Sequence, residues 1–324
     1  MKTAVIILII LLILFVAAGI IGGSVFVDMA LNLERINKKG NKTLTKNTQS
    51  YEYPPYTPGV YCKDPKSWVL NESNYRNVFL KNDGLKLHAI FIPNTGHRYV
   101  VVCHGYSNKA IGMGPFLHKF YLEGFNVLAP DARGHGESEG KYTYMGYREK
   151  HDIVRWIHYI IKQDPEAEIV LWGISMGAST VMFTVGEDLP DNVKCAVEDC
   201  GYASLMDQYR YECNHTVHIP SFPLVNFVNL VTMCKLHFNI RKADTKYSLP
   251  KCRIPMLFIH GDNDTFVPFS NLKKNYDYCK SEKEMLVMKD ATHARSSSFH
   301  PELYWNTVFQ FCEKHLSNKE EEHV

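Results

Sequence analysis

Short apolar runs alternate with amphipathic segments along most of the chain beyond residue 70. Continuous runs of strand length occur at 99–103, 126–130, 169–172, 193–197, 254–260 and 284–288. Apolar residues recur at helical spacing in 115–123, 146–162 and 301–316. Strands that alternate with helices favour an α/β fold whose mostly parallel sheet is covered by helices on both faces.

Two further segments precede this alternation. Residues 75–81 and 85–92 flank the turn signal Asn82-Asp83-Gly84. Two strand-like runs joined by such a turn predict an antiparallel hairpin, which we place at the edge of the sheet.

The N-terminus has a different pattern. Val5 to Val27 contains no charged residue and is rich in Ile and Leu. At about 1.5 Å per residue, a helix of this length spans the roughly 30 Å hydrocarbon core of a bilayer. Residues 1–27 are therefore predicted to be a single-pass transmembrane anchor. A cleaved signal peptide is the alternative, because Ala17-Ala18-Gly19 is similar to a small-residue cleavage site.

The sequence leaves the side of the membrane open. Lysine and arginine residues that follow the apolar segment favour a cytoplasmic location for the C-terminal part. Large C-terminal domains are translocated regardless of such charges. Residues 28–69 are polar for much of their length and predict a tether or wrapping arm, and residues 319–324 predict a charged tail.

Composition narrows the classes of partner. The 324 residues carry a formal net charge of +2, with no basic stripe interleaved with aromatics, so no nucleic-acid partner is expected. The nine cysteines include no C-x-x-C pair, which gives no support for a zinc site or a redox motif. We expect no metal and no organic cofactor, and the sequence does not predict an oligomeric state.

The first indication of a catalytic residue is the motif Gly173-Ile174-Ser175-Met176-Gly177, which follows the apolar run 169–172. In a strand–turn–helix context, G-x-S-x-G forms a nucleophile elbow that exposes the serine on a strained turn. Gly173 and Gly177 suit positions where strand and helix approach closely. Ser175 is therefore the candidate nucleophile.

A serine hydroxyl needs a base to accept its proton and an acid to orient that base. With this elbow the acid and then the histidine follow the serine in the chain, each beyond the end of a strand. Asp264 follows the strand at 254–260, and His293 follows the strand at 284–288. We predict these two as acid and base. Asp262 is expected to bond backbone amides of its turn, and Asp290 remains a minor alternative for the acid.

A developing oxyanion requires backbone N–H donors. One is expected from the residue after the nucleophile, Met176, and a second from the loop after an earlier strand. Residues 99–103 form that strand, so the backbone amide of Tyr106 is the expected second donor. His104 is expected to brace the loop and not to act as a base.

These motifs together resemble the α/β-hydrolase superfamily. Further matches are His104-Gly105 and the segment 130–138, which resembles the superfamily's "PD-x-RGHG-x-S" loop, whose role there is structural. The elbow GISMGA, the segment EDCGY at 198–202 and the stretch FIHGDNDTFVPF at 258–269 are most similar to membrane-anchored serine hydrolases of the Firmicutes type.

The resemblance implies a domain layout and an activity. It places the hydrolase core at 70–202 and 250–318, with residues 203–249 as a lid insertion over the site. It implies a serine hydrolase that acts on carboxylic esters or related small acyl substrates. An acyltransferase or a peptidase with the same triad is the alternative, and a non-catalytic binding module is a third possibility.

Overall fold

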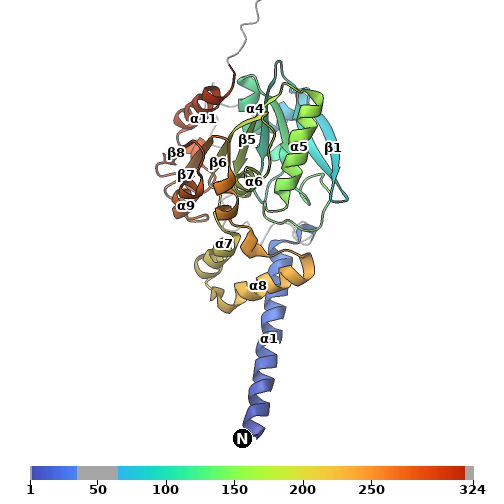
Figure 1. The fold of residues 1–324 in the computed structure, drawn as a ribbon, viewed down its shortest axis with the longest axis vertical. Coiled ribbons are helices and arrows are strands. Elements are labelled where there is room, and N and C mark those ends of the chain that lie inside the picture. Colours follow the sequence, from blue (N-terminus) through green and yellow to red (C-terminus); the bar gives the residue numbers. More distant parts are fainter. Residues whose placement is uncertain (1, 35–64, 318–324) are drawn as a thin grey trace, which may run out of the picture.

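The computed structural model describes residues 2–34 and 65–317 of the chain. A layered α/β body carries a small helical layer at one end, and one long helix, α1, projects from that end (Figure 1). The path of the predicted arm between 35 and 64 and the predicted tail at 319–324 lie outside the described residues.

The body is built on one eight-stranded sheet with the order β1-β2-β4-β3-β5-β6-β7-β8. The predicted hairpin is the antiparallel edge, β2 pairs antiparallel with β4, and all other neighbours are parallel. This confirms the predicted mostly parallel sheet. The strands are β1 Arg76–Asn82, β2 Leu85–Ile92, β3 Arg98–Cys103, β4 Asn126–Pro130, β5 Glu168–Ile174, β6 Val193–Asp199, β7 Met256–Gly261 and β8 Lys283–Met288.

Helices cover both faces of the sheet, because the central strands are apolar on both sides. One core cluster joins the sheet to α3, α4 and α11, and a second joins it to α5, α6 and α9. The helices are α1 Lys2–Ala30, α3 Pro65–Asn71, α4 Gly114–Leu122, α5 Glu149–Gln163, α6 Met176–Thr184, α7 Leu205–Tyr211, α8 Ser221–Leu236, α9 Ser270–Tyr278, α10 Ser296–Phe299 and α11 Pro301–His315.

Residues 203–249, the range predicted as an insertion, form the helical layer beside the end of α1 (Figure 1). The layer contains α7, a π-helical turn, α8 and short 3₁₀ turns. Its own apolar cluster includes Tyr209, Val225 and Val228 together with Val27 and Leu31 from the N-terminal segment. We call residues 203–249 the lid from here on, and its role over the site is a proposal.

The N-terminal segment differs from the predicted boundaries. Helix α1 continues past residue 27 to Ala30, and residues 31–33 then pack on the body. Leu31 and Leu33 are buried, and the backbone of this segment bonds the loop at 141–143. Helix α3 begins at Pro65, inside the range predicted as an irregular arm, because Trp68 and Val69 enter the core. Among the described helices, α1 alone has the length and apolar composition to cross a membrane.

One helix begins later than the periodicity predicts. The pattern places a helix over 146–162, whereas α5 begins at Glu149. Met145 and Gly146 have φ angles of 53° and 86°, which are left-handed conformations that a helix cannot contain. The chain turns there before the helix starts.

Candidate active site

The elbow around Ser175 joins β5 to α6. Ser175 has φ 56° and ψ −120°, a strained conformation for a residue that is not glycine, and α6 starts at the next residue. A Cβ at Gly177 would overlap the carbonyl oxygen of Cys103, and a Cβ at Gly173 would overlap the backbone of Gly177. Only glycine permits this approach of strand and helix, which presents the Ser175 hydroxyl beyond the end of the strand.

The structure brings Ser175, His293 and Asp264 into one hydrogen-bonded chain. The Oγ of Ser175 lies 2.9 Å from the Nε2 of His293. The Nδ1 of His293 lies 2.7 Å from the Oδ2 of Asp264. The three residues follow β5, β8 and β7, whose carboxyl ends meet at one edge of the sheet. The arrangement suits proton transfer from a serine hydroxyl to an oriented imidazole.

Asp264 is held as an anion. Its carboxylate is fully buried, which by itself raises the pKa, but hydrogen bonds from His260 and His293 lower the pKa below the usual range of an aspartate. The amides of Phe266 and Val267 each donate to the Oδ1 at 2.9 Å. The carboxylate therefore remains charged at neutral pH and orients the Nδ1–H of His293.

His260 also contacts Asp264, although the sequence motifs do not predict a role for this histidine. Its Nε2 lies 2.9 Å from the carbonyl oxygen of Val267 and 3.2 Å from the Oδ2 of Asp264. The residue is buried at the end of β7. The ring fixes the loop that carries Asp264, so His260 supports the acid and does not contact the serine. A histidine that ends a buried strand four residues before the acid was the available signal.

The alternative acids have other partners. Asp262 is exposed, and its Oδ1 accepts a hydrogen bond of 2.6 Å from the amide of Asp290. Within residues 65–317, the carboxylate that contacts His293 is that of Asp264. Asp262 thus ties the two loops together, in agreement with the turn-bonding role expected from its position.

The loop after β3 contributes backbone to the site. The Nε2 of His104 accepts from the amide of Ala132 at 3.0 Å, so this ring braces the loop as expected. The carbonyl oxygen of Tyr106 accepts from the Nε2 of His135 at 2.6 Å. In the described part of the chain, the amides of Tyr106 and Met176 have no hydrogen-bond acceptor, which leaves both available to an oxyanion.

The 131–138 loop is structural. Asp131 accepts hydrogen bonds from the amides of Ala110 and Glu137, at 2.7 and 2.9 Å. The Arg133 guanidinium forms a bidentate pair with Asp152, at 2.7 and 2.8 Å. These contacts hold together the loops beneath the site.

Two buried carboxyl groups lie behind the elbow. The carbonyl oxygen of Asp199 accepts from the amide of Ser175 at 2.8 Å, and its side chain accepts from the hydroxyl of Ser296 at 2.9 Å. Glu198 accepts from the amide of Gly201 at 2.9 Å. Burial raises the pKa of Asp199 to about 6 and that of Glu198 to about 8.

One set of side chains could be considered for a metal ion. The candidate ligand atoms of Cys200, Asp264 and His293 lie within 4.8 Å of one another. Asp264 and His293 are already hydrogen bonded to each other. Burial raises the pKa of the Cys200 thiol well above its usual value, so the thiol is neutral and a poor ligand. The donor set fits proton transfer better than ion binding.

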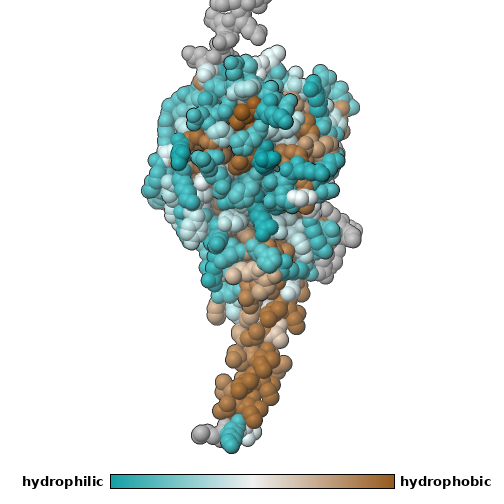
Figure 2. All heavy atoms as spheres, turned by 45° about the vertical axis from the view of Figure 1, so that its right-hand side comes forward, coloured by the Kyte–Doolittle hydropathy of each residue, from teal (hydrophilic) through white to brown (hydrophobic). Residues whose placement is uncertain are grey.

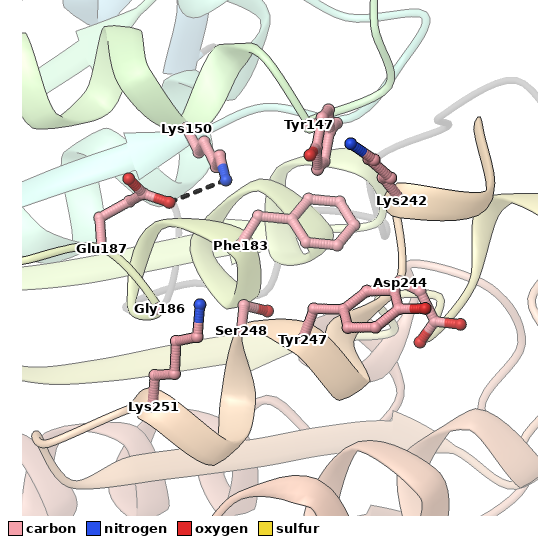
Figure 3. A pocket seen from close by; sticks show the side chains of 10 residues that line it. All are labelled: Tyr147, Lys150, Phe183, Gly186, Glu187, Lys242, Asp244, Tyr247, Ser248 and Lys251. Carbon is pink, nitrogen blue, oxygen red and sulfur yellow. Dashed lines mark ion pairs between the residues drawn. The ribbon is translucent and has the colours of Figure 1, made fainter. Parts of the chain in front are cut away.

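A pocket of about 370 Å³ lies at the other end of α6, between the lid and the body (Figure 3). Phe183 and Tyr247 lie across from each other in it, and Lys150 pairs with Glu187 at 2.7 Å (Figure 3). None of its lining residues is Ser175, His293 or Asp264. This pocket is therefore separate from the hydrogen-bonded chain.

Comparison with known proteins supports the fold described above. Residues 95–202 match the family model described as serine aminopeptidase, S33. This matched range includes Ser175 but neither Asp264 nor His293. YqkD of Bacillus subtilis is 28% identical over 222 residues, which cover 68% of this chain and 72% of that protein. The alpha/beta hydrolase domain-containing protein WAV2 of Arabidopsis thaliana is 24% identical over 289 residues, covering 83% and 89%. The esterase Pf2001 of Pyrococcus furiosus superposes with a TM-score of 0.64 at 25% identity, covering 81% of this chain and 99% of that one.

Proposed function

Because the chain belongs to the α/β-hydrolase superfamily and is a serine hydrolase of that type, we propose that it cleaves carboxylic esters through Ser175, His293 and Asp264. The observation that carries the proposal is the continuous pair of hydrogen bonds, 2.9 and 2.7 Å, that joins the three side chains. The likeness to an esterase supports the choice of substrate class.

The proposed reaction has two halves. The Oγ of Ser175 attacks the ester carbonyl while the Nε2 of His293 takes the hydroxyl proton, and Asp264 stabilises the resulting imidazolium. The amides of Met176 and Tyr106 hold the oxyanion. His293 gives its proton to the departing alcohol, which leaves an acyl group on Ser175. A water molecule, deprotonated by His293, then releases the carboxylic acid and restores the serine.

The test is the turnover of a soluble ester such as p-nitrophenyl butyrate. Ser175→Ala is expected to lower kcat by at least about 10³-fold, because the nucleophile is removed. Ser179→Ala is the matched control, since that hydroxyl lies one helical turn further along α6 and bonds the carbonyl oxygen of Tyr202. Equal activity of Ser175→Ala and the wild-type protein would refute the proposal.

A peptidase that uses the same three residues is the second candidate, favoured by the description of the matching family model. An aminoacyl p-nitroanilide assayed beside the ester separates the two. The proposal predicts a larger kcat/KM for the ester. A binding module without catalysis would turn over neither compound, and an acyltransferase would require an acceptor other than water.

The proposal includes a membrane tether formed by α1. The side chains of residues 3–18 are all exposed, and those of Leu8, Leu12 and Leu14 are more than half exposed. Such a surface suits lipid and not water. The competing role is a cleaved signal sequence. Extraction of cell membranes with alkaline carbonate and N-terminal sequencing of the mature protein separate them, and protease accessibility in intact cells gives the side of the membrane.

A further inference from the structure

The lid lies against the apolar helix α1 (Figure 1). The ring of Phe227, on α8, packs on Gly19, where any Cβ would overlap it. A Cβ at Gly23 would lie 2.9 Å from the carbonyl carbon of Phe227. Phe15 meets the same ring edge to face, with centroids 5.9 Å apart. The glycines thus allow α8 to approach the backbone of α1, as in helix pairs within membranes.

With α1 as the proposed membrane anchor, these contacts give the depth of the lid relative to a bilayer. A helix needs about 20 residues to cross the hydrocarbon core, which from Ala4 extends to Gly23. Phe15 and Gly19 lie inside this stretch, and Phe227 contacts both. The first half of α8 is therefore level with the last turns of the membrane-spanning part of α1.

The lid also exposes large apolar side chains. The exposed fraction reaches 74% at Phe222, the second residue of α8, whose backbone is extended (φ −96°, ψ 132°). Figure 2 shows the apolar surface of α1 running up to the base of the body. The exposed large apolar side chains of α8 and of the turn before it, called the lid apolar surface, are Val217, Ile219, Phe222, Leu230 and Met233. Tyr247, the other exposed residue of this kind in the lid, lines the separate pocket described above.

The edge of the sheet that carries the candidate triad faces the lid and the end of α1. The Tyr106 hydroxyl donates to the carbonyl oxygen of Ala30 at 2.7 Å. From α7, Gln208 and Tyr211 donate to the carbonyl oxygens of Phe266 and Thr265, in the loop of Asp264. The oxyanion loop and the acid loop are thus bonded to the end of α1 and to the lid.

We propose that the lid apolar surface inserts into the lipid leaflet where α1 leaves it, and that the ester is an amphiphilic lipid drawn from that leaflet. The substrate assignment rests on the ester hydrolase function proposed above. An interfacial helix buries its apolar side chains at the boundary between head groups and acyl chains. A substrate that enters along such a lid keeps its acyl chain out of water between the leaflet and Ser175.

Fluorescence quenching tests the contact with lipid. The full chain is reconstituted in phosphatidylcholine vesicles that contain brominated acyl chains, and Phe222→Trp is compared with Leu303→Trp. Leu303 is also exposed, on α11 at the opposite end of the body (Figure 1). We expect brominated lipid to lower the added fluorescence of Phe222→Trp at least twofold and to leave that of Leu303→Trp unchanged. Equal quenching of the two variants would overturn the proposed surface.

Kinetics test the substrate class. The readout is the ratio of turnover of a long-chain ester in vesicles to turnover of p-nitrophenyl butyrate in solution. Phe222→Asp is expected to lower this ratio at least tenfold and Leu303→Asp to leave it unchanged, with thermal unfolding as a check on folding. An unchanged ratio in Phe222→Asp overturns the lipid-substrate assignment. If neither ester is turned over in a Ser175-dependent manner, the ester hydrolase function fails instead, and the quenching result still decides the lipid contact.

Discussion

The hydroxyl of Tyr106 donates a hydrogen bond of 2.7 Å to the carbonyl oxygen of Ala30, the last residue of α1. Ala30 ends the apolar helix, and the amide of Tyr106 is a proposed oxyanion donor. The position of that amide therefore depends on a contact with the N-terminal helix. The proposed tether is part of the support of the site.

Tyr106→Phe removes this hydrogen bond and keeps the backbone amide. We expect the free energy of unfolding to fall by about 1 kcal/mol, as for one intramolecular hydrogen bond. We expect kcat to fall by about 3–10-fold with little change in KM, because a less fixed donor stabilises the oxyanion less well. Tyr247→Phe is the control, since that residue is half exposed in a pocket away from the triad. A larger effect on KM than on kcat would contradict the positioning role.

Asp264→Asn should separate the effect of side-chain shape on kcat from the effect of the negative charge. The amide side chain has nearly the same shape, but it no longer holds His293 in the tautomer that accepts the serine proton. On the proposed mechanism kcat falls by about 10⁴-fold. Asp262→Asn, two residues earlier and exposed, is expected to change kcat by less than a few fold. Steady-state kinetics with the soluble ester provide the comparison, and similar losses in both variants would point to a structural role for the loop alone.

Gly177→Ala should damage the fold as well as the site. The added Cβ would overlap the carbonyl oxygen of Cys103, so β3 and α6 would have to separate. We expect a lower melting temperature and loss of esterase activity. Gly22→Ala is the matched control, because its Cβ would lie 3.4 Å from the Cδ1 of Leu224, an ordinary contact. A Gly177→Ala protein as stable as the control would contradict the close packing described here.

Glu198→Gln should change how stability depends on pH. Burial raises the pKa of Glu198 to about 8 in the folded protein, so the folded state keeps a proton that the unfolded state releases near pH 4.5. Between these values the folded protein binds more protons, and its stability falls as pH rises. Glutamine has no such proton.

The melting temperature of Glu198→Gln relative to the wild-type protein should therefore increase from about pH 4.5 to about pH 8 and stay constant above that. Asp199, whose pKa is also raised, is present in both proteins and cancels in the difference. Thermal unfolding across this pH range tests the expectation. A difference that does not vary with pH would mean that Glu198 is not buried as a neutral acid.

The mostly parallel sheet was predictable because each central strand is a continuous apolar run between turn signals. The positions of Ser175, Asp264 and His293 were predictable because each follows such a run, and carboxyl ends of parallel strands meet at one edge. Their placement within hydrogen-bonding distance is a finding of the structure, and their catalytic roles remain a proposal.

Other features depend on contacts that periodicity does not contain. His260 ends an apolar run like any packing residue, and only the folded loop brings it to Asp264. The delayed start of α5 follows from left-handed backbone at Met145 and Gly146. The packing of Gly19 against Phe227 joins segments some two hundred positions apart in the sequence, and no local pattern in either segment predicts it.

The most direct measurement is labelling with a fluorophosphonate probe, followed by mass spectrometry of the labelled peptide. A serine activated by an imidazole 2.9 Å away forms a stable phosphonate adduct. The proposed mechanism predicts one adduct, on Ser175, that is lost in both Ser175→Ala and His293→Ala. The absence of an adduct on the folded protein, or an adduct on Ser175 that forms equally well in His293→Ala, would contradict it.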